Sequence, residues 1–299
     1  MLFAGLVALM ALFPQQSTDL FFKIERSASG LHHKTIVVGE ETWTYLDGGP
    51  EDAEVILMLH GFGGDKDNWT RFSRALTDRY RVIAPDLPGF GESVLHPDWD
   101  YSLPQQRGRV RDFAWALGVD RYHIVGNSMG GQLAVLYAHA HPEAVASLAL
   151  FNNAGITVPA RTEMDRGLEN GRNLLIAESV SDFDELIDFT CYKKPFIPWP
   201  AKGVLAQRAM EHAESNKFIF AALMNDHSTG LEPILGEISP PVLVLWGEYD
   251  RVLDVSAVNK MQDLLPAPDV IIMKDTGHVP MIERPTETAE HYLSFIDRQ

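Results

Sequence analysis

The chain has 299 residues, enough for one large α/β domain with or without an inserted segment. Hydrophobic residues make up 45% of it and aromatic residues 10%, so it can bury a sizeable core, which excludes a disordered protein. The formal net charge of -16 at pH 7 argues against nucleic acid as a partner, because phosphate backbones select basic surfaces.

The first expected element is an apolar helix at Leu2–Phe13, too short to span a bilayer by itself. Its length suits a signal-peptide core, but no Lys or Arg precedes it and no clear cleavage site follows. Ser17–Ile24, with two phenylalanines and a lysine, could extend an interfacial helix. We therefore predict a hydrophobic and amphipathic segment over residues 1–30 that binds a membrane surface, in a protein that is membrane-associated or exported to the cell envelope. The alternative is a cytoplasmic protein whose first helix packs on its own domain or on a partner subunit.

Strand and helix patterns then alternate along the chain. Two short alternating runs, Thr35–Val38 and Thr42–Tyr45, predict a hairpin, and the apolar run Val55–Leu59 predicts a strand covered on both faces. This alternation predicts an α/β fold with a mostly parallel central sheet flanked by helices. The next expected elements are a helix at Asp65–Asp78, a strand at Arg81–Ala84, a helix at Leu103–Leu117, a strand at Tyr122–Val125, a helix at Met129–His141 and a strand at Ala146–Phe151.

The alternation stops over residues 155–236. This segment has a mostly helical composition, contains the proline and aromatic cluster Pro195–Pro200, and shows no strand pattern. We predict that it forms a helical cap inserted after the sixth strand, and that residues 31–154 and 237–299 form the α/β core. The core resumes with a strand at Pro241–Trp246, a helix at Ser256–Leu265, a strand at Val270–Met273 and a helix at Pro285–Asp297.

Ser128 lies in the sequence GNSMG, at the junction between an expected strand and an expected helix. A serine hydroxyl is a weak nucleophile unless a base takes its proton, and a sharp strand-to-helix turn exposes the side chain. So tight a turn requires neighbours without bulky side chains, which Gly126 and Gly130 provide. Ser128 is therefore the predicted nucleophile.

Asp250 and His278 each follow another expected strand. The carboxyl ends of parallel strands meet at one edge of a sheet, where ligands bind in open α/β folds. A serine nucleophile needs a base, and the base needs an acid that holds its tautomer. The chain order Ser128, Asp250, His278 is the order of nucleophile, acid and base in α/β-hydrolases, so we predict these three as catalytic residues.

Other polar residues are interpreted as structural. Asp254 stands where the next helix begins and is interpreted as its cap. Asp86 is expected to shape a turn, and His60 to hold a glycine-rich loop by hydrogen bonding. The only cysteine, Cys191, cannot form an intramolecular disulfide or anchor a cysteine-rich metal site, and is interpreted as a small buried hydrophobe. No metal and no cofactor are expected.

Five segments together resemble the α/β-hydrolase superfamily: HGFGG, DLPGFGES, GNSMGG, WGEYDRVLD and TGHVPMIERP. The combination of GNSMGGQ, VLDVSA and MIERP looks most like the monoacylglycerol lipase branch and related bacterial lipases and esterases. The resemblance implies an oxyanion hole formed by the backbone N–H groups of Phe62 and Met129. Met129 begins an expected helix, so its N–H is an unpaired donor near the positive end of the helix dipole, and Phe62 lies in a glycine-rich loop.

An acyl-enzyme on Ser128 is compatible with esters, thioesters, amides and certain carbon–carbon bonds. The resemblance favours a carboxylic ester hydrolase whose partner is a small-molecule acyl ester, such as monoacylglycerol or a medium-chain ester. Two alternatives stay open: a carbon–carbon bond hydrolase of the aromatic-degradation type, whose oxyanion loop usually contains a proline that HGFGG lacks, and a non-catalytic ligand receptor. Candidates for binding the acyl chain are apolar residues of the expected cap, namely Phe196, Trp199, Phe220 and Met224.

Overall fold

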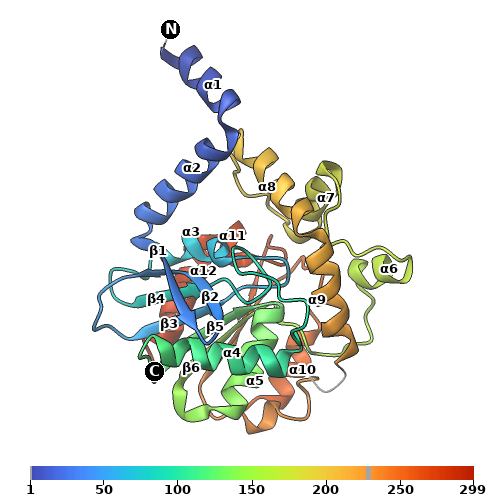
Figure 1. Cartoon of the computed structure of the whole chain (residues 1–299). Helices are drawn as coiled ribbons and strands as arrows, with labels where there is room; N and C mark the ends of the chain where they lie inside the picture. The colour runs from blue at the N-terminus through green and yellow to red at the C-terminus, as the bar shows by residue number, and fades with distance from the viewer. Residues whose placement is uncertain (1, 227–229) are drawn as a thin grey trace.

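The computed structural model describes residues 2–226 and 230–299 and contains the expected mostly parallel sheet flanked by helices (Figure 1). Met1, the first residue of the predicted segment 1–30, lies outside the described residues. The strands form one 8-stranded sheet in the order β1-β2-β4-β3-β5-β6-β7-β8, and only the β1–β2 and β2–β4 pairs are antiparallel. The strands are β1 (Leu31–Val38), β2 (Glu41–Gly48), β3 (Val55–Leu59), β4 (Arg81–Pro85), β5 (Tyr122–Asn127), β6 (Val145–Phe151), β7 (Val242–Gly247) and β8 (Asp269–Met273).

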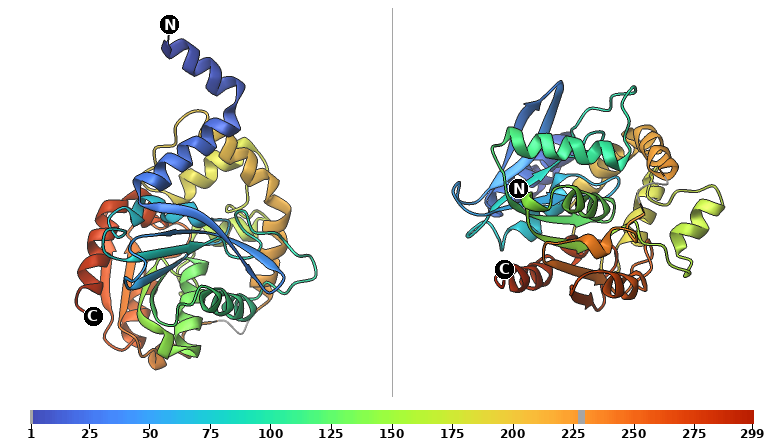
Figure 2. Two further views of the ribbon diagram at one scale, coloured as in Figure 1. Left: turned by 60° about the vertical axis from the view of Figure 1, so that its left-hand side comes forward. Right: turned by 90° about the horizontal axis from the view of Figure 1, so that it is seen from below.

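Helices cover both faces of the sheet, as the alternation of strands and helices predicts (Figures 1 and 2). Successive side chains of β3 enter the two cores in turn, Ile56 and Met58 on one face and Leu57 and Leu59 on the other. One face packs against α3 (Thr70–Ser73), α11 (Pro280–Glu283) and α12 (Pro285–Ile296), and the other against α4 (Leu103–Ala116), α5 (Met129–Ala140) and α10 (Ala257–Leu264). Short 3₁₀ helices are η1 (Lys66–Trp69), η2 (Pro142–Ala144) and η3 (Leu235–Glu237).

Between β6 and β7 the chain forms the expected helical insertion. We refer to residues 155–236 as the cap segment, of which 227–229 lie outside the described residues. Figure 1 shows its helices at one end and side of the sheet, with α8 beside the N-terminal helices. The helices are α6 (Glu163–Glu169), α7 (Val180–Thr190), α8 (Ala201–Glu211) and α9 (Ala213–Asn225).

The N-terminal segment consists of two helices, α1 (Leu2–Leu12) and α2 (Pro14–Ala28). Pro14 lacks a backbone N–H and suits the first turn of a helix, so α1 ends and α2 begins there. Figures 1 and 2 show α1 pointing away from the rest of the molecule, whereas α2 lies against it beside α8. Within residues 2–226 and 230–299, no helix is long and apolar enough to cross a bilayer.

The expected helix at Asp65–Asp78 is shorter in the structure. Regular helix ends at Ser73 and is followed by turns. The carbonyl of Ser73 accepts the N–H groups of both Leu76 and Thr77, and the Thr77 hydroxyl donates to the Ser29 carbonyl instead of facing solvent. Trp69, Phe72 and Leu76, which stand at helical spacing in the sequence, are all buried, but tertiary contacts interrupt the helix.

Candidate active site

Ser128 lies at the turn between β5 and α5 with φ 54° and ψ -121°. A backbone conformation this uncommon for a non-glycine residue costs about 1–3 kcal/mol and persists only where the surroundings impose it. The two glycines of the motif permit it by close approach. A Cβ on Gly126 would lie 2.3 Å from the Gly130 carbonyl oxygen, and a Cβ on Gly130 would lie 2.3 Å from that of Leu59. The turn is therefore tight because Gly126 and Gly130 have no side chains, as the sequence indicates.

His278 and Asp250 form a buried pair beside this turn. The Nδ1 atom of His278 lies 2.8 Å from Oδ2 of Asp250, and a nitrogen facing a carboxylate there carries the proton, so Nε2 is left as a proton acceptor. Oδ2 of Asp250 also accepts a hydrogen bond from Asn152 Nδ2 at 2.7 Å. Its other oxygen, Oδ1, accepts the N–H groups of Val252 at 2.8 Å and Leu253 at 3.0 Å. The carboxylate is thus saturated with donors and held in one orientation.

Two asparagines at strand ends support this pair, and the sequence analysis missed both. Asn152 directly follows β6 and donates to Asp250, while Asn127 ends β5 and donates from Nδ2 to the carbonyl oxygen of His278 at 3.0 Å. Both occupy the carboxyl edge of the sheet. The rule that predicts Asp250 and His278, a polar residue after an expected strand, would also have selected them.

Glu283 is a further residue to which the sequence analysis assigns no role, although it lies in the segment TGHVPMIERP. Its carboxylate accepts the N–H of Gly277 at 2.9 Å and that of Lys193 in the cap segment at 2.9 Å. The N–H of His278 donates to the carbonyl of Thr190, at the end of α7, at 2.8 Å. The loop that contains His278 is therefore hydrogen-bonded to the cap segment through its own backbone and through Glu283.

Of the two predicted oxyanion residues, Met129 directly follows Ser128 at the start of α5, and Phe62 lies in the loop after β3. Phe62 follows β3 and Met129 follows β5, and these strands are parallel neighbours. A Cβ on Gly61 would lie only 3.1 Å from the Cβ of Ser128, so the loop after β3 passes directly beside the turn. Both ring nitrogens of His60 are occupied in holding this loop, by the carbonyl of Gly61 at 2.8 Å and the N–H of Leu87 at 2.9 Å. Burial lowers the pKa of His60 to about 4, so its ring is neutral.

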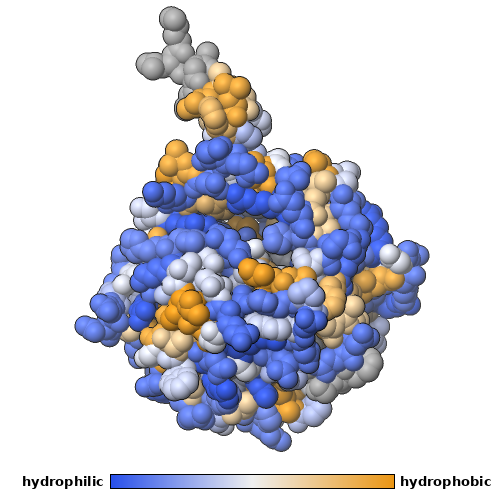
Figure 3. Space-filling model, viewed as in Figure 1, coloured by the Kyte–Doolittle hydropathy of each residue, from blue (hydrophilic) through white to orange (hydrophobic). Residues whose placement is uncertain are grey.

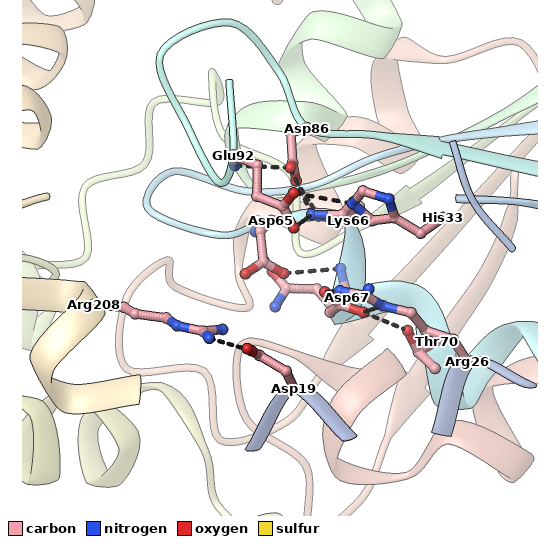
Figure 4. Close-up of polar contacts among 11 residues, drawn as sticks. Asp19, Arg26, His33, Asp65, Lys66, Asp67, Thr70, Asp86, Glu92 and Arg208 are labelled. Carbon is pink, nitrogen blue, oxygen red and sulfur yellow. Dashed lines mark hydrogen bonds and ion pairs between the residues drawn. The ribbon is translucent and has the colours of Figure 1, made fainter. Parts of the chain in front are cut away.

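A buried lysine supports the same loop (Figure 4). Lys66 is 1% exposed, and its Nζ donates to Asp86 Oδ2 and to Glu92 Oε1, each at 2.8 Å. Its backbone N–H donates to Asp86 Oδ1 at 2.8 Å, and the N–H of Glu92 donates to Asp86 Oδ2 at 2.9 Å. Asp86 therefore joins the loop after β3 to the turn after β4, as expected for a residue that shapes that turn.

Replacing Lys66 with methionine should destabilise the protein by about 3–5 kcal/mol, because Asp86 would remain buried without its cationic partner. The measurement is urea unfolding followed by circular dichroism. The matched control is Glu92→Gln, which alters the half-exposed partner of the same lysine and should cost less than about 1 kcal/mol. Equal losses in the two variants would contradict this account of the buried pair.

Ser128 and His278 line a cavity of about 330 Å³ whose walls come from the core, the cap segment and α2. Of the four residues predicted to bind the acyl chain, Phe196 lines this cavity, and Phe220 packs against the ring of the lining residue Phe62 with centroids 5.3 Å apart. Trp199 and Met224 are 56% and 55% exposed, and neither is among the described residues that line this cavity. Trp199 lies in an irregular loop and Met224 in the last turn of α9, where their side chains face solvent.

Residues 56–291 match the alpha/beta hydrolase family. The chain belongs to this family. Lipase 1 of Psychrobacter immobilis is 36% identical to this hydrolase, and the match covers 93% of this chain and 88% of that protein. A monoacylglycerol lipase of Xenopus laevis is 28% identical, and the match covers 95% of this chain and 88% of that protein. The crystal structure of a membrane phospholipase A, a bacterial virulence factor, has a TM-score of 0.92 and 44% identity, covering 99% of this chain and 98% of that one. The predicted fold and the predicted resemblance to monoacylglycerol lipases and bacterial lipases are confirmed.

The contacts of Asp254 and Cys191 in this hydrolase fit the structural roles that the sequence indicates. Asp254 accepts the N–H of Ser256 at 2.9 Å just before α10, as expected for a residue that caps the helix start. Cys191 is buried and lines the cavity, and burial raises the pKa of its thiol to about 12. A thiol with so high a pKa is a poor nucleophile, so Cys191 acts as part of the wall.

Proposed function

We propose that this hydrolase cleaves carboxylic esters with a single acyl chain, monoacylglycerols and medium-chain esters in particular, through an acyl-enzyme on Ser128. The observation that carries the proposal is the placement of Ser128, on its strained turn, in one cavity with His278, which is paired with the buried Asp250. The lipase and monoacylglycerol lipase relatives support ester hydrolysis and do not favour carbon–carbon cleavage or a receptor without activity.

In the proposed reaction, Nε2 of His278 takes the proton of Ser128 Oγ as that oxygen attacks the ester carbonyl carbon. The oxygen of the tetrahedral intermediate accepts hydrogen bonds from the N–H groups of Phe62 and Met129, donors that are typically worth about 3 kcal/mol each. Protonated His278 then gives its proton to the leaving alcohol. A water molecule activated by the same histidine releases the fatty acid, while Asp250 holds the tautomer and stabilises the imidazolium.

The proposal is tested by measuring fatty acid release from monooleoylglycerol and from a series of p-nitrophenyl esters. A fluorophosphonate, which labels activated serines, should add one phosphonyl group, and peptide mass spectrometry should place it on Ser128. Folded protein that hydrolyses none of these esters and takes no label would overturn the proposal. Cleavage of a dienone substrate in preference to every ester would instead identify the carbon–carbon bond hydrolase.

We further propose that α1 attaches the protein to a membrane surface. Leu9, Leu12 and Phe13 are exposed, and Figure 3 shows apolar side chains gathered on the helix that projects from an otherwise mostly hydrophilic face. The net charge of -16 disfavours electrostatic attraction to anionic lipids, which leaves apolar insertion as the source of affinity. The membrane phospholipase A that is similar over nearly the whole chain supports this location.

Deleting residues 1–13 should release the protein from lipid vesicles without changing its rate on p-nitrophenyl butyrate. The deletion removes α1 and leaves α2 to begin at Pro14, and each apolar side chain no longer buried in lipid loses about 2 kcal/mol of binding free energy. Vesicle flotation and the soluble-ester assay measure the two properties separately. Full-length protein that stays in the aqueous fraction, or a truncation that abolishes butyrate hydrolysis, would contradict the proposed role of α1.

A further inference from the structure

The helix α2 forms part of the cavity that contains Ser128, although it lies outside the predicted cap. One stripe of α2 faces the protein at a spacing of three or four residues, and it includes Thr18, Phe21, Phe22 and Glu25. Phe21, Phe22 and Glu25 line the cavity. In Figure 3 the surface is hollowed directly beneath this helix.

The cap segment supplies apolar residues to the same cavity. Ile187 of α7 and Leu205 and Ala209 of α8 line it, and α8 packs beside α2. The cavity therefore extends from Ser128 at the edge of the sheet to a region bounded by α2 and the cap segment. An acyl chain whose carbonyl lies at Ser128 would have its distal methylenes in this region.

Two ion pairs connect α2 to the core. Arg26 donates to both carboxylate oxygens of Asp67, from Nε at 2.7 Å and from Nη2 at 2.5 Å, and both side chains are mostly buried (Figure 4). Glu25 accepts from Arg71 Nε at 2.7 Å. Because the Arg26 pair is bidentate and poorly exposed to solvent, it contributes more to the position of α2 than a surface pair would.

A third pair connects α2 to the cap segment. Asp19 accepts from Arg208 Nη2 of α8 at 2.6 Å (Figure 4). Arg71, which binds Glu25, also donates from Nη2 to the carbonyl of Phe196 at 3.2 Å. Core, cap segment and α2 are thus joined around the cavity, so the rings of α2 have a defined position in its wall.

We propose that Phe21 and Phe22 bind the distal part of the acyl chain and determine the preference of the enzyme for longer acyl groups. The proposal rests on the proposed ester hydrolysis at Ser128. A short acyl group is accommodated beside Ser128, whereas a longer one reaches α2 and buries methylenes against the two rings. Each methylene that becomes buried in this way raises kcat/KM on the order of fourfold.

The test compares kcat/KM for p-nitrophenyl butyrate, octanoate and dodecanoate, each below the concentration at which it aggregates. In Phe21→Ala and Phe22→Ala the ratio of the dodecanoate to the butyrate value should fall by about tenfold, the low end of what a missing apolar group costs in a pocket. Matched controls are Leu20→Ala and Ile24→Ala, which shorten exposed apolar side chains on the other face of the same helix and should leave the ratio unchanged.

The variants Phe21→Leu and Phe22→Leu keep an apolar side chain and serve if an alanine variant does not fold, as judged by circular dichroism. They should lower the ratio in the same direction by less. An unchanged ratio in all folded Phe21 and Phe22 variants, or an equal fall in the Leu20 and Ile24 controls, would overturn the inference while ester hydrolysis stands. Wild-type protein that hydrolyses none of the three esters would instead refute the proposed function.

Discussion

Replacing Ser128 with alanine should lower the rate of ester hydrolysis by about a millionfold, the loss that follows removal of the nucleophile in other serine hydrolases. Alanine keeps the Cβ, so the backbone at φ 54° gains no new strain and the fold should be retained. Without Oγ no acyl-enzyme forms, and His278 has no proton to accept. The measurement is burst and steady-state kinetics with p-nitrophenyl butyrate on protein with an unchanged thermal midpoint.

Fluorophosphonate labelling supplies a second readout for this variant. The label should disappear in Ser128→Ala and persist in Ser27→Ala, which removes an exposed serine hydroxyl on α2. Retention of a tenth of the wild-type rate in Ser128→Ala, or label found on another serine, would assign the nucleophile elsewhere.

Replacing Asp250 with asparagine should lower turnover by about ten-thousandfold. In the part of the chain that the structure describes, this carboxylate is surrounded by four hydrogen-bond donors: His278 and Asn152 at Oδ2, and the N–H groups of Val252 and Leu253 at Oδ1. An amide NH₂ would face donors in either orientation. If the NH₂ replaces Oδ2, His278 must turn Nδ1 into an acceptor and protonate Nε2, the atom that has to receive the serine proton.

Asp254→Asn is the matched control, since it makes the same change four residues away. Within the described part of the chain, the Asp254 carboxylate accepts only the N–H of Ser256, at Oδ1, and the asparagine side chain keeps an oxygen for that bond. The rate should therefore stay close to that of the wild type. If Asp254→Asn lost most of the activity and Asp250→Asn little, the acid would be Asp254.

The sequence predicts the candidate active site because parallel strands place their ends together. Ser128, Asp250 and His278 are far apart in the chain, yet each lies in the segment that follows a parallel strand, and the sheet brings all three to one edge. The supporting residues were harder to predict. Asn152 satisfies the same rule but resembles an ordinary turn residue, and Glu283 lies within α11 where its partners Gly277 and Lys193 are unknown until the fold is built.

The role of α2 could not be predicted from periodicity alone. Ser17–Ile24 carries apolar side chains on both faces of a helix, with Phe21 and Phe22 on one and Leu20 and Ile24 on the other, so the pattern does not identify the face that docks. The contacts that determine which face of α2 docks join residues that are distant in sequence. Asp19 and Arg208, which join α2 to α8, are 189 positions apart.

The hydrogen bonds between the His278 loop and the end of α7 restrict how the cap segment can move. The N–H of His278 donates to Thr190, and Glu283 binds both Gly277 and Lys193, so displacing this end of the cap would also displace the base from its position. On the other side of the cavity, α8 packs beside α2 and is joined to it by the Asp19–Arg208 pair, which is exposed and therefore contributes little in water. We therefore expect the cap to pivot about the α7 end and to admit substrate on the α8 side, so that the enzyme opens without disassembling its proton-transfer pair.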